Sequence, residues 1–260
     1  MLTTPSSSRI EHFANHLSLS FDDCGSGSPV LVLHGGGGPR SVASFVQAMS
    51  SNARVLAPTH PGFGDTARPS WFTGIDDLAD AAVALLDRLG LDDVLVVGFS
   101  MGGWIACEVA LRAQSRLRGL VLVDAVGIEV EAESIVDVFT LTPRGLADLS
   151  YHDPDRYALD PATLSPEQRE SIAGNFRSLA TYCGERNMRD PGLRDRLGNI
   201  SIRTLVAWGA SDRIVTARYG QAFAAAIPQS RFELIEECGH LPQIEQPQRL
   251  LALVRDFDSA

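Results

Sequence analysis

The stretch Val94-Leu95-Val96-Val97-Gly98-Phe99-Ser100-Met101-Gly102 decides how this chain folds. Its apolar start predicts a buried strand, and the apolar residues 103–111 that follow predict a buried helix. A G-x-S-x-G pentapeptide between a strand and a helix is the pattern of a nucleophile elbow, in which a tight turn lifts the serine hydroxyl above the sheet. A purely structural turn is the alternative, and the flanking strand and helix disfavour it. We therefore predict that Ser100 is a nucleophile.

The rest of the chain alternates between strand and helix patterns. Apolar runs predict buried strands at residues 30–33, 54–58 and 120–124, and further strands are predicted at residues 203–208 and 231–235. Helical patterns lie between them at residues 45–49, 76–89 and 216–226, and a closing helix follows the last strand. Residues 17–21 alternate apolar and polar side chains, which predicts a half-exposed edge strand, followed by a turn over residues 22–29. The alternation predicts an α/β fold, with a mostly parallel central sheet and helices on both faces.

The alternation stops between residues 127 and 200, where charge density rises and the patterns become helical. We predict a helical cap of residues 127–200 inserted into a core of residues 1–126 and 201–260, because active-site loops accept such insertions. A few surface helices are the alternative. The stretch Ser165-Pro166-Glu167-Gln168 predicts a helix start. Candidates for lining a pocket are Phe139, Phe176, Tyr182 and Met188, although aromatic residues at helical spacing more often pack in a core.

The composition is that of a soluble globular enzyme. The 260 residues fit one large α/β domain, with or without an insertion, and 45% of them are hydrophobic. A net charge of −10 argues against nucleic acid or an acidic membrane surface as a partner, and leaves a small-molecule substrate. All 22 basic residues are arginines, which excludes a Schiff-base lysine and a P-loop lysine.

Neither a metal site nor a targeting segment is predicted. The cysteines at positions 24, 107, 183 and 238 have no metal-ligand spacing, so we expect free thiols and no bound metal or cofactor. Residues 1–13 lack the apolar region of a signal peptide, and no apolar run is long enough to span a bilayer. We therefore expect a cytoplasmic protein, whose oligomeric state the sequence leaves open.

Three residues that can form a catalytic triad follow predicted strands. Ser100, Asp212 and His240 occur in this order, and the carboxyl ends of parallel strands meet at one edge of a sheet, so the three can converge. In such a triad His240 takes the serine proton as general base, and Asp212 orients the imidazole. Asp124 also follows a strand. We favour Asp212 as the acid, because it lies in a flexible Gly/Ser-rich turn and the next strand end carries His240, and we expect Asp124 to brace the chain.

The Gly-rich stretch His34-Gly35-Gly36-Gly37-Gly38-Pro39 follows another buried strand. Such a loop exposes backbone N–H groups to a ligand, but the G-K-[ST] ending of a phosphate-binding P-loop is missing. We predict that backbone N–H groups near Gly36 and at Met101 bind the oxyanion of a carbonyl substrate. His34 is expected to brace this loop rather than to act as a catalyst.

In combination these motifs resemble the α/β-hydrolase fold superfamily over nearly the whole chain. The matching stretches also include His60-Pro61-Gly62-Phe63-Gly64, Trp208-Gly209-Ala210-Ser211-Asp212 and Gly239-His240. The resemblance implies that Ser100 is the nucleophile, Asp212 the acid and His240 the base, with Gly36 and Met101 as oxyanion-hole donors. The dehalogenases and epoxide hydrolases of this superfamily carry an aspartate at the elbow, so Ser100 argues against both.

The Gly-rich loop and the elbow look like those of meta-cleavage-product C–C hydrolases, with two departures. Phe99 stands where those enzymes usually have asparagine, and Leu241 where they often have tryptophan. Arg177 is a candidate for their cap arginine. The loop also departs from the H-G-G-P-G pattern of proline iminopeptidases. We expect a serine hydrolase that cleaves a small carboxylic ester or lactone through an acyl-enzyme on Ser100. The alternatives are a C–C hydrolase and a small-molecule receptor that retains the triad.

Overall fold

The computed structural model describes residues 7–13 and 16–260, and these contain one sheet of eight strands. The order of the strands in the sheet is β1-β2-β4-β3-β5-β6-β7-β8, with antiparallel pairing at β1–β2 and β2–β4 and parallel pairing elsewhere. In chain order the strands are β1 (Ser7–His12), β2 (Ser18–Gly25), β3 (Pro29–Leu33), β4 (Arg54–Pro58), β5 (Val94–Phe99), β6 (Leu117–Val123), β7 (Thr204–Gly209) and β8 (Ser230–Ile235). The predicted α/β fold with a mostly parallel sheet is confirmed.

The N-terminal edge differs from the prediction. Residues 17–21 were expected at the edge, but β2 lies between β1 and β4 and runs on to Gly25, so part of the predicted turn is strand. The sequence of β1 is polar and carries no apolar alternation. It joins the sheet through backbone pairing, and Arg9 forms ion pairs with Asp23 and Glu11. Of the segment for which we expect no signal peptide, residues 1–6 lie outside the described residues.

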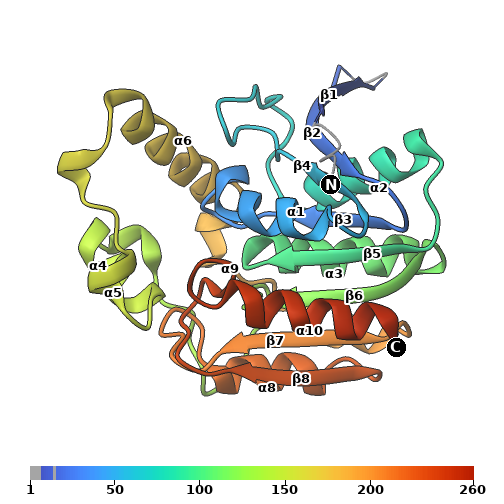
Figure 1. Cartoon of the computed structure of the whole chain (residues 1–260). Helices are drawn as coiled ribbons and strands as arrows, with labels where there is room; N and C mark the ends of the chain where they lie inside the picture. Colours follow the sequence, from blue (N-terminus) through green and yellow to red (C-terminus); the bar gives the residue numbers. More distant parts are fainter. Residues whose placement is uncertain (1–6, 14–15) are drawn as a thin grey trace.

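Helices cover both faces of the sheet (Figure 1). Alternate residues of each parallel strand point to opposite faces, so Leu31 and Leu33 pack in one core layer and Val30 and Val32 in the other. The first layer contains α2 (Ile75–Leu89), α3 (Met101–Ala113) and α8 (Ala217–Ala225), and the second contains α1 (Ala43–Met49) and α10 (Pro247–Ser259). The remaining elements of the core are η1 (Pro39–Val42), η2 (Gln114–Arg116) and α9 (Pro242–Glu245).

Residues 127–200 contribute helices and no strand of the sheet. In Figure 1 the helices α4, α5 and α6 lie beyond the carboxyl ends of the parallel strands. The predicted start of α6 is confirmed: Ser165 Oγ accepts a hydrogen bond from the N–H of Gln168, and the Gln168 side chain accepts one from the N–H of Ser165. The elements are η3 (Val138–Thr140), α4 (Pro143–Ser150), α5 (Pro154–Tyr157), η4 (Pro161–Thr163), α6 (Pro166–Cys183), η5 (Gly184–Arg186), α7 (Leu193–Arg196) and η6 (Leu197–Asn199).

The four cysteines are buried, and none of them forms a disulfide within the described part of the chain. None of the helices in the described part of the chain combines the length and the apolar character needed to cross a membrane.

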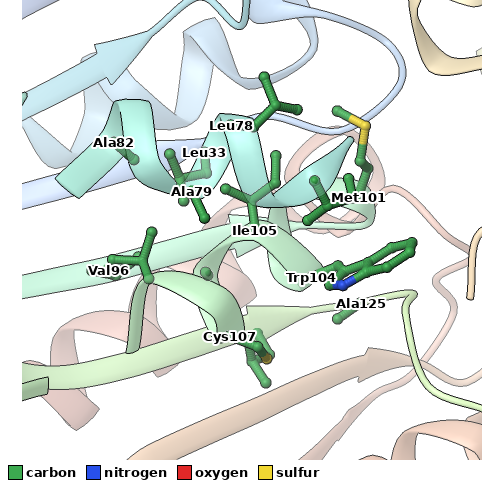
Figure 2. Close-up of a cluster of buried hydrophobic side chains, with 14 of the residues drawn as sticks. Leu33, Leu78, Ala79, Ala82, Val96, Met101, Trp104, Ile105, Cys107 and Ala125 are labelled. Carbon is green, nitrogen blue, oxygen red and sulfur yellow. The ribbon is translucent and has the colours of Figure 1, made fainter. Parts of the chain in front are cut away.

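Helix α3 is the buried centre of the first core layer. Figure 2 shows Met101, Trp104 and Ile105 on this helix among side chains of α2 and the sheet, such as Leu78 and Val96. A helix that is apolar on all sides is stable only when it is covered on all sides. Its first turn approaches the sheet very closely, since a Cβ atom at Gly102 would overlap the carbonyl oxygen of Leu33. Glycine is therefore required at this position.

The close approach of α3 predicts the effect of Gly102→Ala. The methyl group would press on backbone that cannot move without separating α3 from β3, so we expect the free energy of unfolding to fall by about 3 kcal/mol. Gly174→Ala is the matched control, because Gly174 also lies in a helix but has no neighbour closer than 3.7 Å to the added Cβ. It should stabilise the protein by about 0.5–1 kcal/mol, as alanine does in a helix interior. Urea denaturation measures both, and equal midpoints for the two variants would contradict the prediction.

Candidate active site

The predicted elbow is present between β5 and α3. Ser100 has φ +52° and ψ −118°, a conformation that residues with side chains rarely adopt, and it directly precedes the first turn of α3. The Ser100 N–H donates to the carbonyl of Val123, and its carbonyl accepts from the N–H of Gly103 and Val126. These bonds hold the strained residue in place on both sides, so its hydroxyl has a fixed direction.

Ser100, His240 and Asp212 form one hydrogen-bonded chain. His240 Nε2 lies 3.0 Å from Ser100 Oγ, and His240 Nδ1 lies 2.7 Å from Asp212 Oδ2. Asp212 Oδ1 accepts hydrogen bonds from the backbone N–H groups of Ile214 at 2.8 Å and Val215 at 3.1 Å. The Asp212 side chain is fully buried and that of His240 is 10% exposed. The structure thus brings together the three residues selected from the sequence, with the geometry that proton transfer from the serine requires.

A buried carboxylate positions the loop that carries His240. Glu245, on α9, accepts hydrogen bonds from the backbone N–H groups of Gly239, His152 and Asp153. The N–H of His240 itself donates to the carbonyl of Ser150 at 2.7 Å. The end of α4 and the histidine loop are therefore tied together. Sequence analysis did not identify Glu245, because a glutamate after a histidine loop has no distinctive pattern.

Asp124 lies beside the chain of three but does not contact His240 through a hydrogen bond. It is fully buried at the end of β6, and its Oδ1 accepts the N–H of Gly209 at 2.9 Å, so it braces β7 as expected. Burial raises the pKa of Asp124 well above its usual range, and the charge of Asp212 raises it further.

Asp124, Asp212 and His240 are the one group of three side chains, among the described residues, whose possible metal-ligand atoms lie close enough together, within 4.8 Å. Both oxygens of Asp212 and both ring nitrogens of His240 are used in the hydrogen bonds given above. We therefore assign the group to hydrogen bonding rather than to metal binding.

The two predicted oxyanion-hole donors flank Ser100. Met101 is the first residue of α3, where helical N–H groups have no partner within the helix, and Gly36 lines the same cavity as Ser100. Neither N–H donates a hydrogen bond to another described residue. Both remain available to an oxygen held beside Ser100, and the N-terminal end of α3 favours negative charge there.

His34 braces the Gly-rich loop, as predicted from the sequence. Its Nδ1 lies 2.8 Å from the carbonyl of Gly35, and its Nε2 accepts the N–H of His60 at 3.1 Å. The His60 ring packs 4.0 Å from the His34 ring. Burial lowers the pKa of His34 to about 4 and holds that of His60 well below its usual range. Because His34 uses both ring nitrogens in the neutral form, it is not available as a base.

A cavity of about 510 Å³ opens above Ser100 and His240. Two of the four candidate lining residues, Phe176 and Met188, contribute to its wall. The other two do not: Phe139 packs against Phe176, and Tyr182 donates its hydroxyl to the carbonyl of Pro61. Most of the wall is apolar, with side chains that include Val138, Leu146, Leu159, Leu164, Ile172, Leu179 and Ile214.

The arginine that lines the cavity, Arg40, is not the one that sequence analysis selected. Arg177 is not part of the cavity wall; its side chain is 66% exposed and paired with Glu170, so the structure does not bring this candidate for a cap arginine to the cavity. Arg40 lines the cavity instead, and its guanidinium makes no hydrogen bond or ion pair with another described residue. Its position shortly after the glycines of the loop was the available signal.

Helix α6 is anchored to both Gly-rich loops at the sheet edge. Asn175 donates to the carbonyl of Gly37 and accepts the N–H of Gly64, at 3.1 and 2.9 Å. Ser178 and Tyr182 donate to the carbonyls of Gly62 and Pro61. These polar residues hold the apolar wall of α6 over Ser100. The sequence predicts Tyr182 as apolar packing, and the roles of Asn175 and Ser178 depend on loops more than 100 residues away.

Comparison with known proteins shows that the chain as a whole is similar to hydrolases. The model of the alpha/beta hydrolase family matches residues 30–253. The chain is 32% identical to a 2-hydroxymuconate semialdehyde hydrolase of Pseudomonas putida, over 90% of this chain and 88% of that protein. Among solved structures it is similar to the meta-cleavage product hydrolase CumD (TM-score 0.78, 26% identity, 97% and 98% of the two chains). It is also similar to a thermophilic esterase of Thermogutta terrifontis (TM-score 0.76, 26% identity, 98% of each chain).

The buried neutral His34 predicts a loss of stability in acid. Its folded-state pKa of about 4 lies below the value near 6.5 of the unfolded chain, so the unfolded state takes up a proton first as the pH falls. Stability present at pH 7 is lost between about pH 6.5 and 4, and at pH 5 the loss from His34 should be about 2 kcal/mol. Urea denaturation at pH 7 and pH 5 measures it. His34→Asn should reduce this pH dependence, whereas His12→Gln, at an exposed histidine, should retain it.

Proposed function

The chain belongs to the alpha/beta hydrolase family, and from this premise we propose that it is a serine hydrolase cleaving a small carboxylic ester or lactone through an acyl-enzyme on Ser100. The observation that carries the proposal is the hydrogen-bonded chain from Ser100 Oγ through His240 to Asp212 at the base of an apolar cavity. This arrangement activates a hydroxyl against a carbonyl carbon.

The proposed reaction follows from the geometry. His240 Nε2 takes the proton of Ser100 as Oγ attacks the carbonyl carbon, and Asp212 stabilises the resulting imidazolium. The N–H groups of Gly36 and Met101 bind the oxyanion, each contributing about 3 kcal/mol by analogy with measured cases. The tetrahedral intermediate then collapses, and His240 passes its proton to the leaving alkoxide. A water molecule, deprotonated by His240, releases the acid and restores Ser100.

We further propose that residues 127–200 act as a cap that selects the substrate. The anchoring of α6 to the loops of residues 35–38 and 60–64 supports this role, because it holds Phe176 and Leu179 in the cavity wall. An apolar wall of this kind favours the hydrocarbon part of a small substrate. Arg40, without an ionic partner, is placed to attract a substrate that carries a negative charge in addition.

Cleavage of a C–C bond is the second candidate, because the comparisons favour it. The relative and the solved structure cited above are named as hydrolases of meta-cleavage type, and 2-hydroxymuconate semialdehyde contains a carboxylate. A serine activated in the same way can attack the carbonyl carbon of a ketone, and the adjacent C–C bond then breaks if the departing carbanion is stabilised. A substrate screen of short-chain esters, lactones and vinylogous 1,5-diketones decides between the candidates. A kcat/KM for the diketones far above that for every ester would assign C–C hydrolysis.

The role of Ser100 is tested by covalent labelling. A fluorophosphonate should label this hydroxyl in the wild-type protein, because its attack uses the same base and the same oxyanion donors as the proposed reaction. Ser100→Ala should abolish both labelling and acyl transfer, with an unchanged unfolding midpoint as the control for folding. Labelling that persists in Ser100→Ala would contradict the proposal. Tight, saturable binding of a small molecule without turnover would favour a receptor that retains the triad.

The cap is tested by Phe176→Ala, measured on the same substrate screen. Removing this ring enlarges the cavity, so kcat/KM should fall by about tenfold or more for the preferred substrates and rise in relative terms for bulkier ones. Arg177→Ala is the matched control, since Arg177 is the next residue of α6 and faces solvent. If the two variants have the same kcat/KM ratios across all substrates, residues 127–200 do not select the substrate.

A further inference from the structure

A second buried carboxyl group lies directly behind the proposed catalytic acid. Asp124 leaves β6 with φ +44°, an uncommon conformation for a residue with a side chain, which turns its carboxyl group toward the end of β7. Possible ligand atoms of Asp124, Asp212 and His240 lie within 4.8 Å of one another, so the two carboxyl groups are close neighbours. Both carboxyl groups are buried, so water does not screen them.

The hydrogen bonds of the two groups are unequal. Asp212 accepts three N–H donors, two from the backbone at Oδ1 and the imidazole at Oδ2. Asp124 accepts one, the N–H of Gly209 at Oδ1, and its Oδ2 is buried without an N–H or hydroxyl donor among the described residues. The Asp212 carboxylate, which is itself an acceptor, lies close by, since possible ligand atoms of the two groups are within 4.8 Å of each other. Two acceptors form a stable contact only if one of them carries a proton.

The surrounding charges indicate which group carries it. Besides Asp212 and His240, the titratable groups near Asp124 are Glu245 on α9 and Cys238 on the loop after β8, and neither of these two supplies a positive charge. Three backbone N–H groups already stabilise Glu245 as a carboxylate. The imidazole of His240 forms its hydrogen bond with Asp212 and not with Asp124. Burial, and then the Asp212 charge, raise the pKa of Asp124 well above its usual range, which agrees with this hydrogen-bond arrangement.

We propose that Asp124 is a neutral carboxylic acid whose hydroxyl donates a hydrogen bond to the Asp212 carboxylate, which makes Asp124 a positioning residue for Asp212 and His240. The pair then carries a single negative charge. The donor fixes the rotation of the Asp212 carboxylate so that Oδ2 faces the imidazole, and it draws charge away from that oxygen. Its expected effect on turnover rests on the proposed function, whereas its protonation does not.

Infrared spectroscopy tests the protonation without turnover. In the difference spectrum between the wild-type protein and Asp124→Asn at about pH 6, the wild type should show the carbonyl stretch of a protonated carboxylic acid, shifted by 13C-labelling of aspartate. A difference spectrum that contains carboxylate bands alone would overturn the proposal. Since Ser100 labelling is measured separately, failure of this inference and failure of the proposed function are distinguishable.

The pH profile of kcat/KM tests the positioning role. Asparagine at position 124 is neutral, can accept the N–H of Gly209 and can donate an N–H to Asp212, so Asp124→Asn should keep the midpoint of the acid limb within about 0.3 pH unit. Asp124→Leu has a similar shape but no donor. It should lower kcat by about tenfold and raise that midpoint by about one pH unit, because the Asp212 charge then acts on the imidazole undiminished.

Two outcomes of these measurements would overturn the proposal. One is a fall of the acid-limb midpoint by about one pH unit in Asp124→Asn, since this would mean that a negative charge had been removed. The other is a loss of kcat in Asp124→Asn as large as that in Asp212→Asn, which would make Asp124 the acid itself. If Asp124→Leu does not fold, the infrared spectrum and the profile of Asp124→Asn still decide.

Discussion

The close contact between β5 and the first turn of α3 is the constraint on which the rest of the structure depends. A Cβ atom at Gly98 of β5 would overlap the carbonyl oxygen of Gly102, and Ser100 is held at a positive φ between these two buried elements. Such strain persists only where the surrounding packing determines the backbone. The buried apolar surface of α3 supplies that packing, and the same turn leaves the N–H of Met101, beside the serine hydroxyl, without a hydrogen-bond partner among the described residues. The packing that stabilises the fold and the groups proposed to act in catalysis thus lie in the same short segment.

The charged groups of the site are stabilised by backbone N–H groups rather than by cations. Asp212 and Glu245 each accept backbone N–H donors, and the arginine that lines the cavity, Arg40, forms no ion pair with either carboxylate among the described residues. Fixed dipoles of this kind stabilise a charge without a competing ion pair that would hold Asp212 away from the imidazole. A third carboxyl group, that of Asp124, fits into the same region only in neutral form, because none of the described residues offers its Oδ2 a hydrogen-bond donor.

Helix α6 links the cavity wall to the loops beneath it. Its apolar side chains form part of the wall, while Asn175, Ser178 and Tyr182 use their polar atoms to bind loop carbonyls and an N–H group. The shape of the cavity and the position of the loops are therefore coupled through one helix. This coupling gives a physical reason why proteins of one fold can differ in substrate, as the esterases and C–C hydrolases among the similar structures do.

Much of the fold and the core of the site could be predicted from local sequence. Apolar runs locate the six parallel strands, and the order of Ser100, Asp212 and His240 at strand ends brings them to one edge of the sheet. The polar strand β1 was missed, because backbone pairing holds it and apolar periodicity does not. Because β1 pairs with β2, β1 and not β2 is the edge strand of the sheet.

By itself the sequence determined the elements whose signal is local: buried strands, helix starts, the elbow and the residue types of the triad. The tertiary structure alone decided which polar side chains meet. In the folded chain Arg177 is exposed to solvent and Arg40 lines the cavity. Asn175 forms hydrogen bonds to loops more than 100 residues away, and Asp124 lies close to Asp212. The physical reason is that periodicity reports burial one element at a time, whereas hydrogen bonds and charge depend on partners that only the packing of distant segments supplies.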